Sequence, residues 1–118
     1  MPNIKLTILL LEPHSTIRNI IQEMLSEHGH SCIITDSPEA ALRHFHSNDD
    51  IDILILDTSE QLFNYTRLIE SIHQDQADFP IIIMVPHASD YQTLGVVPLS
   101  KPFASEGLFQ AIEKAMNN

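Results

Sequence analysis

Five short apolar runs alternate along this chain with segments whose apolar residues recur at helical spacing. Continuous runs of Ile, Leu and Val are typical of strands that are covered on both faces of a sheet. We predict strands at residues 6–11, 31–35, 53–57, 81–85 and 96–99. Pro98 interrupts the last run. Because proline has no N–H to donate, we expect that strand at an edge of the sheet.

Four helices are predicted in the remaining segments, at residues 15–28, 38–48, 61–73 and 105–116. In each of them apolar residues stand three and four positions apart, which indicates one buried face. The predicted inward residues are Ile17, Ile20, Ile21, Met24 and Leu25; Ala41, Leu42 and Phe45; Leu62, Tyr65, Leu68, Ile69 and Ile72; and Leu108, Ala111, Ile112 and Ala115.

Local signals mark the ends of the first two helices. Ser15 is the expected N-cap of the first helix, and Gly29 is its expected stop. The sequence Ser37-Pro38-Glu39 supplies a cap, a proline at the first helical position and an acid in the first turn. We therefore expect the second helix to begin at Pro38.

The order of these elements predicts a single α/β domain over residues 1–118. Strands that alternate with helices imply a parallel sheet with helices on both of its faces. The link at residues 86–95 is short and shows little periodicity. We therefore expect no full helix between the last two strands.

Composition narrows the class of protein. Sixteen acidic residues against six basic ones give a formal charge of −10 at pH 7. A surface of that sign repels phosphate backbones, so direct binding of nucleic acid is not expected. The apolar runs are too short to span a membrane, and a cytoplasmic protein is the simplest interpretation. Cys32 is the only cysteine, which excludes an internal disulfide, and its apolar neighbours favour a place in the core or the sheet.

Charged residues stand at the ends of three predicted strands. The run Ile53–Asp57 ends in a carboxylate, Glu12 follows the first strand, and Lys101 follows the last. The carboxyl ends of parallel strands meet at one edge, where open α/β sheets place their sites, so we expect these side chains to lie together. Two structural alternatives stay open. Glu12 is a salt-bridge partner of Lys101, or Lys101 pairs with Asp57 and no ligand is involved.

The order of elements, Glu12, the sequence I-L-I-L-D ending at Asp57, and S-K-P-F at residues 100–103 resemble a response-regulator receiver domain. The resemblance covers essentially the whole chain. It implies a flavodoxin-like fold with five parallel strands in the order 2-1-3-4-5. It also implies phosphorelay signalling, in which a histidine kinase or phosphotransfer protein phosphorylates an aspartate. Such a protein is not an enzyme beyond its own phosphorylation, and it signals through contacts with a partner protein, an output domain or a second copy.

The same resemblance implies roles for four residues. Asp57 matches the phosphoacceptor, an aspartate that acts as a nucleophile. Glu12, Asp57 and the backbone carbonyl of Ser59 match the positions that hold Mg²⁺, here weakly, and Lys101 matches the contact to the phosphoryl oxygens. The Lys101-Pro102 bond matches a peptide bond that is commonly cis in the family.

Several departures from the family pattern affect its usual switch. Pro13 stands where the second of two adjacent acids, normally the direct metal ligand, is expected. Val85 replaces a hydroxyl residue after the fourth strand, and Pro98 replaces an aromatic residue. Lys101 follows Val85 by only 16 residues, so the fourth helix is expected to be missing or reduced to one turn. The alternative function is therefore a pseudo-receiver, a protein-interaction or dimerisation module that works without phosphorylation.

The seven histidines raise a second metal hypothesis. Two pairs stand at i, i+2 spacing, which points their rings to different faces of a helix and makes a poor chelate. These pairs are His28 with His30 and His44 with His46. His14 and His87 follow strands at the charged edge, where together with Glu12 and Asp57 they are candidate ligands of a transition metal. Two other interpretations stay open, a solvated loop position for both histidines and a role for His87 as a phosphoryl donor.

Overall fold

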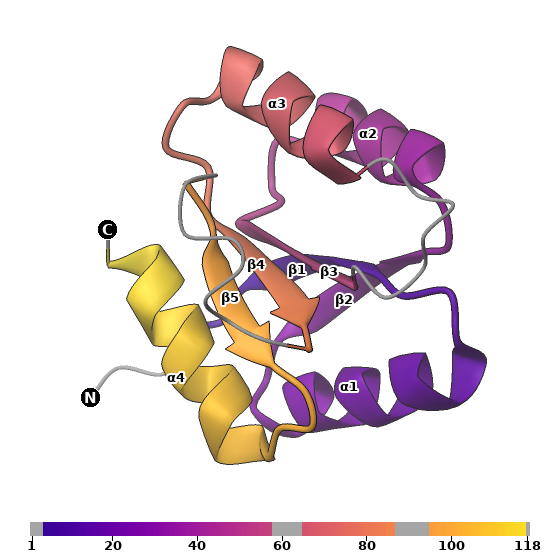
Figure 1. Cartoon of the computed structure of the whole chain (residues 1–118), viewed down its shortest axis with the longest axis vertical. Helices are drawn as coiled ribbons and strands as arrows, with labels where there is room; N and C mark the ends of the chain where they lie inside the picture. Colours follow the sequence, from indigo (N-terminus) through magenta and orange to yellow (C-terminus); the bar gives the residue numbers. More distant parts are fainter. Residues whose placement is uncertain (1–3, 58–64, 87–94, 118) are drawn as a thin grey trace.

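The computed structural model describes residues 4–57, 65–86 and 95–117. Its strands are β1 (Thr7–Leu11), β2 (Ser31–Thr35), β3 (Ile53–Asp57), β4 (Ile81–Val85) and β5 (Val97–Ser100). All neighbouring strands are parallel, and they form one sheet in the order β2-β1-β3-β4-β5 (Figure 1). The predicted strand order is confirmed, and β5, which contains Pro98, lies at an edge as expected.

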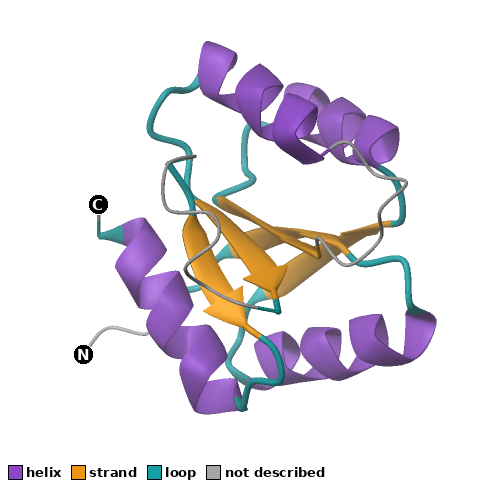
Figure 2. Ribbon diagram, in the orientation of Figure 1, coloured by secondary structure: helices purple, strands orange, loops and turns teal. Residues whose placement is uncertain are grey.

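Four helices flank this sheet in the described part of the chain. They are α1 (Ser15–Glu27), α2 (Pro38–Ser47), α3 (Tyr65–Asp75) and α4 (Ser105–Met116). Figures 1 and 2 show α1 and α4 on one face of the sheet and α2 and α3 on the other. None of these helices is long and apolar enough to cross a membrane.

Alternate side chains of the central strands point to opposite faces of the sheet and pack into two separate cores. In β1, Ile8 and Leu10 pack on the side of α1 and α4, whereas Leu9 and Leu11 pack on the side of α2 and α3. Every residue of β3 and β4 is buried. Burial on both faces explains why these strands are continuous apolar runs without polar alternation. Cys32 lies half-buried in β2 against the first core, as predicted, and burial raises the pKa of its thiol.

The ends of the first two helices follow the sequence signals, with one correction. The Ser37 hydroxyl accepts a hydrogen bond from the Ala40 N–H at 3.1 Å, which confirms the predicted cap of α2. Gly29, with φ of 86°, follows the last turn of α1 in the left-handed conformation that glycine adopts without strain. The prediction of Ser15 as the N-cap is wrong. His14 is the cap, because its carbonyl already accepts the first helical bond from the Arg18 N–H at 2.9 Å.

The predicted inner faces are confirmed for α4 and only in part for α1. All four inward residues of α4 are buried, as are Ala41 and Phe45 of α2 and Leu68, Ile69 and Ile72 of α3. Leu42 and Tyr65 are half-buried, and Leu62 lies outside the described residues. In α1, Ile21 and Leu25 are buried and Met24 is half-buried. Ile17 and Ile20 are 39% and 50% exposed, so their predicted burial is wrong.

The connection between β4 and β5 is short, as the sequence indicates. Only residues 86–96 join the two strands, and residues 87–94 of that link lie outside the described residues. The described residues of the link, 86, 95 and 96, are not helical. The predicted start of the third helix at residue 61 also lies outside the described residues. The described part of α3 begins at Tyr65.

Candidate functional site

Three strands bring charged side chains to the carboxyl edge of the sheet. Glu12 follows β1, Asp57 is the last residue of β3, and Lys101 follows β5. The Glu12 N–H donates to the Thr35 carbonyl at 3.3 Å, which extends the ladder between β1 and β2 by one residue. The Lys101 N–H donates to the Val85 carbonyl at 2.8 Å, which fixes Lys101 beside the end of β4. The predicted meeting of Glu12, Asp57 and Lys101 at one edge is therefore observed.

Asp57 and Lys101 form an ion pair across the end of β4. The Asp57 side chain is fully buried, and the Lys101 Nζ donates to its Oδ1. About a quarter of the Lys101 side chain (24%) remains exposed, so the ammonium lies between the buried carboxylate and solvent. The Lys101-Pro102 peptide bond is cis, as the family resemblance implies.

Glu12 is the second fully buried carboxylate of this edge. Its Oε2 accepts a hydrogen bond from the His14 backbone N–H at 3.2 Å and lies 3.2 Å from the His14 Nδ1. Its Oε1 is buried and has no hydrogen-bond donor among the described residues. Burial is the main cause that raises the pKa of the Glu12 carboxyl, and the nearby Asp57 charge raises it further. His14 and Lys101 act in the opposite direction.

The predicted alternative of a Glu12–Lys101 salt bridge is wrong. Among the described residues, Lys101 pairs with Asp57 and Glu12 pairs with His14. The reason is geometric. Lys101 is anchored to β4, which neighbours β3, whereas β1 lies on the far side of β3. The other alternative, a Lys101–Asp57 pair, matches the observed contact.

Arg18 is a residue of this edge that the sequence analysis missed. Its Nη1 donates to the Glu12 carbonyl at 3.1 Å and thereby ties the first turn of α1 to the end of β1. One signal was present in the sequence, because Arg18 stands four residues after His14 and so lies on the same side of the helix. Arg18 therefore helps to fix the backbone at Glu12, whereas Lys101 is the cation bound to a carboxylate of this edge.

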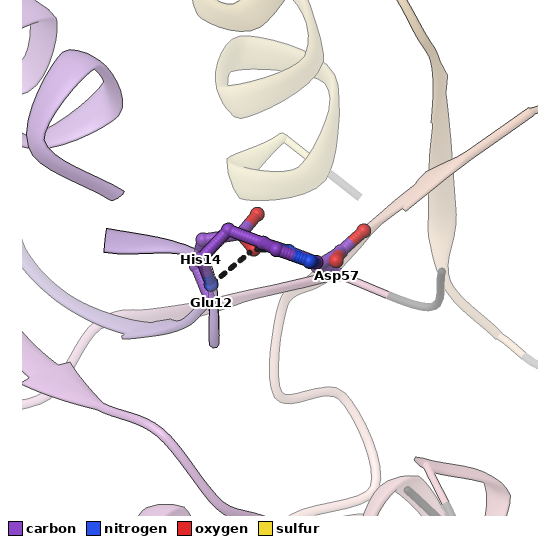
Figure 3. A group of neighbouring side chains, drawn as sticks. All are labelled: Glu12, His14 and Asp57. Carbon is purple, nitrogen blue, oxygen red and sulfur yellow. Dashed lines mark hydrogen bonds and ion pairs between the residues drawn. The ribbon is translucent and has the colours of Figure 1, made fainter. Parts of the chain in front are cut away.

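The histidines separate into one at the site and several elsewhere. His14 joins Glu12 and Asp57 in a group (Figure 3) in which one ligand atom from each residue lies within 4.8 Å of the other two. The predicted ligand His87 and the Ser59 carbonyl lie outside the described residues. The pairs at i, i+2 spacing form no comparable group in the part of the chain that is described. The members with side-chain contacts are His28, stacked on Phe109; His30, which accepts from the Leu6 N–H at 3.1 Å; and His46, 2.7 Å from Asp75.

The two apolar replacements noted in the sequence lie close to this edge. Val85 is fully buried at the end of β4. Pro98 is half-buried in β5 opposite Ile83. Neither side chain carries a hydrogen-bond donor, so neither can donate a side-chain hydrogen bond to an anion held at Asp57.

The arrangement of charges suits a nucleophilic or metal-binding carboxylate. Two buried carboxylates are hard oxygen donors of the kind that Mg²⁺ prefers. The Oε1 of Glu12 is buried without a hydrogen-bond partner among the described residues, so it is an oxygen that could bind a cation. Lys101 provides a positive charge beside Asp57 that can also bind an anionic group attached there.

Comparison with known proteins identifies relatives over nearly the whole chain. Residues 8–113 match the family model described as the response regulator receiver domain. A curated relative, the two-component response regulator PprB of Pseudomonas aeruginosa, is 22% identical over 117 residues. The match covers 92% of this chain and 42% of that protein, so the chain spans less than half of its relative's length.

Solved structures share the fold. A response regulator receiver domain protein from Clostridium thermocellum gives a TM-score of 0.81 with 24% identity, over 95% of this chain and 94% of that one. A sensor protein from Polaromonas sp. JS666 gives 0.84 with 21% identity, over 98% of both chains. The chemotaxis response regulator CheY4 of Vibrio cholerae gives 0.81 with 18% identity, over 95% and 99%. At these identities the structures support the fold alone.

Proposed function

Because this chain belongs to the response regulator receiver domain family, we propose that Asp57 accepts a phosphoryl group from a histidine kinase or a phosphotransfer protein. The observation that carries the proposal is the environment of Asp57. It is a fully buried carboxylate at the end of the central strand β3, with the Lys101 ammonium bound to it and a second buried acid, Glu12, beside it.

The proposed reaction is a displacement at phosphorus. A carboxylate oxygen of Asp57 attacks the phosphorus of a phosphohistidine, a P–O bond forms, and the P–N bond of the donor breaks. The donor imidazole leaves with the electron pair, and an aspartyl phosphate remains on this chain. Lys101 then neutralises phosphoryl oxygens in place of part of its contact with the carboxylate.

The residues at this edge fit a bound Mg²⁺, though with fewer carboxylates than the family normally provides. Glu12 and Asp57, with the backbone carbonyl of Ser59, are the groups that would hold it. When bound, the ion supplies positive charge that offsets the negative charge of the transferring phosphoryl group. The buried Oε1 of Glu12 supports this proposal, because it is an oxygen donor without a hydrogen-bond partner among the described residues.

The site of modification can be located chemically. The full chain is incubated with acetyl phosphate and Mg²⁺, and borohydride then reduces any aspartyl phosphate to homoserine, which peptide mass spectrometry identifies. We expect conversion at position 57. Conversion at another carboxylate, or none in a folded sample, would contradict the assignment of Asp57.

The wider role proposed is signal transfer in the cytoplasm by one receiver domain over residues 1–118. Receiver domains are signalling modules, and we propose no enzymatic activity beyond phosphoryl transfer to Asp57. The output would be a changed contact with a partner protein, an output domain or a second copy of this chain. A phosphorylation-dependent change needs an interaction that differs between the two forms.

Val85 favours a second candidate function, a pseudo-receiver that binds partners without phosphorylation. This fully buried valine offers no donor to a phosphoryl group at the end of β4. Titration with millimolar Mg²⁺, followed by NMR, separates the two candidates. Shifts clustered at residues 12–14, 57–59 and 101 support the receiver, and the absence of such shifts supports the pseudo-receiver.

A further inference from the structure

We propose that Glu12, His14 and Asp57 form a cation site that prefers a first-row transition-metal ion, such as Co²⁺, Ni²⁺ or Zn²⁺, over Mg²⁺. The inference rests on the proposed function in so far as the same carboxylates serve both. Metal binding is nevertheless measurable on the unphosphorylated chain, so the two proposals can fail separately.

The three side chains are close enough to share one ion. One ligand atom from each of the three residues lies within 4.8 Å of the other two. Donors bound to one ion at about 2.1 Å are about 3.0 to 4.2 Å apart, so closure of the site takes a movement on the order of 1 Å. His14 follows β1 in an exposed loop position and can make that movement, whereas both carboxylates are held in the core.

One separation already matches a coordination edge. The His14 Nδ1 lies 3.2 Å from the Glu12 Oε2. Two ligands at about 2.1 Å from one ion are about 3.0 Å apart in octahedral geometry and about 3.4 Å apart in tetrahedral geometry. Figure 3 shows the His14 ring gathered with the two carboxylates at this edge.

A second observation supports a cation at this site independently of the histidine. The Glu12 Oε1 is fully buried and accepts no hydrogen bond from the described residues. A buried carboxylate oxygen without a partner is costly, and an ion is one of its ordinary explanations. Arg18 does not meet this need, because its guanidinium donates to the Glu12 backbone carbonyl oxygen.

The chemistry of the donor set decides the preferred ion. Mg²⁺ takes oxygen ligands almost exclusively, so at this site it gains little from an imidazole. Imidazole nitrogen suits Fe, Ni, Cu and Zn, and affinity for a mixed nitrogen–oxygen site rises along the first-row divalent ions. Pro13 removes a possible carboxylate, and His14 adds a nitrogen donor. Both changes shift the preference from Mg²⁺ to the transition metals.

His14→Ala tests the imidazole without removing a structural contact of the helix. His14 caps α1 through its backbone and makes no side-chain cap bond, and its N–H bond to Glu12 is kept by alanine. His44→Ala is the matched control, since His44 is an exposed histidine on α2. Calorimetric titrations with Co²⁺ and with Mg²⁺ are compared for the full-length wild-type chain and both variants.

We expect Co²⁺ to bind the wild type at least about tenfold more tightly than Mg²⁺. His14→Ala should weaken Co²⁺ binding at least about tenfold while Mg²⁺ affinity changes less than about twofold. His44→Ala should behave as the wild type. Equal Co²⁺ affinity in the wild type and His14→Ala, or Co²⁺ binding no tighter than Mg²⁺ binding, would overturn the proposal.

Two further measurements guard against binding elsewhere and against a misfolded variant. Paramagnetic broadening by Co²⁺ in the wild-type NMR spectrum should be strongest around residues 12–14 and 57, and broadening centred on other histidines would overturn the proposal. His14→Asp exchanges the nitrogen donor for an oxygen donor, so the ratio of Co²⁺ to Mg²⁺ affinity should fall. An unchanged ratio in that variant would also count against the proposal.

Discussion

At the scale of single residues, Glu12 and Asp57 show that the effect of burying a carboxylate depends on its partners. Both carboxylates are fully buried, yet their partners differ. Asp57 has the Lys101 ammonium, and among the described residues Glu12 has only the neighbouring His14, on one of its two oxygens. The strand ends in the sequence predicted which acids meet. They left two partners open for Lys101, namely Glu12 and Asp57, and they did not predict the contact between His14 and Glu12, because it depends on how the loop after β1 turns.

Glu12→Gln should stabilise the metal-free chain. The glutamine oxygen keeps the hydrogen bond from the His14 N–H and removes a buried charge, so we expect a gain of roughly 1 kcal/mol in the free energy of unfolding at pH 7. Burial raises the pKa of Glu12 above its ordinary value of 4.5, so the folded chain binds this proton more tightly than the unfolded chain does. The wild type therefore loses stability as the pH rises above 4.5, and the gain in Glu12→Gln should shrink as the pH falls towards that value.

Urea unfolding in the presence of a chelator measures this gain. The exposed Glu23 on α1 provides the matched control, and Glu23→Gln should change the free energy of unfolding by less than about 0.5 kcal/mol. A destabilised Glu12→Gln, or a gain that does not depend on pH, would contradict the description of Glu12 as a buried carboxylate with an unpartnered oxygen.

Lys101→Met should destabilise the chain, because it removes the ammonium that neutralises Asp57. We expect a loss of roughly 2 kcal/mol, below the full cost of breaking a buried pair because Lys101 is partly exposed. Adding Asp57→Asn removes the buried charge itself and should restore at least about half of the loss, which a double-mutant cycle quantifies.

The exposed Lys114 on α4 is the control for this pair. Lys114→Met should lie within about 0.5 kcal/mol of the wild type. If Asp57→Asn and Lys101→Met prove additive in thermal or urea unfolding, the ion pair between them contributes nothing to stability, and this part of the account is wrong.

At the scale of the elements, the strands were more predictable than the orientation of the helices. A strand buried on both faces is a continuous apolar run, and the bounds of β2, β3 and β4 agree with the prediction. A helix face depends on its rotation against the sheet. Ile21 and Leu25 of α1 are buried, and Arg18 and Gln22 on the adjoining flank are half-buried, while Ile17 and Ile20 face outwards. The contact from Arg18 to the end of β1 favours this rotation, and the apolar spacing alone does not encode it.

The rotation of α1 can be tested with truncations on its two flanks. Leu25→Ala opens a cavity in the core shared with α4 and should cost about 3 kcal/mol of unfolding free energy. Ile20→Ala removes a side chain that is 50% exposed and should cost less than about 1 kcal/mol. Denaturant unfolding of both variants decides the matter, and equal costs would mean that the predicted apolar face of α1 was right after all.

At the scale of the whole molecule, the fold explains why the charged residues of the candidate site lie together at one edge of the sheet. A parallel sheet in the order β2-β1-β3-β4-β5 brings the ends of β1, β3 and β5 to one edge, and helices cover both faces of the sheet. The sequence was sufficient to predict this architecture and the edge itself. It was not sufficient for the link between β4 and β5, where residues 87–94 lie outside the described part of the chain. The sequence also lacks the hydroxyl and aromatic residues of the usual switch, at Val85 and Pro98.

The most direct test of the account is the intact mass of the full chain after incubation with acetyl phosphate and Mg²⁺. The wild type, Asp57→Asn and the control Asp49→Asn, which changes an exposed acid, are compared with and without the metal. We expect the wild type and Asp49→Asn to gain one phosphoryl group in a metal-dependent reaction, and Asp57→Asn to gain none. A wild type that remains unmodified while folded, or an Asp57→Asn variant that is still labelled, would contradict the claim that Asp57 is the phosphoacceptor.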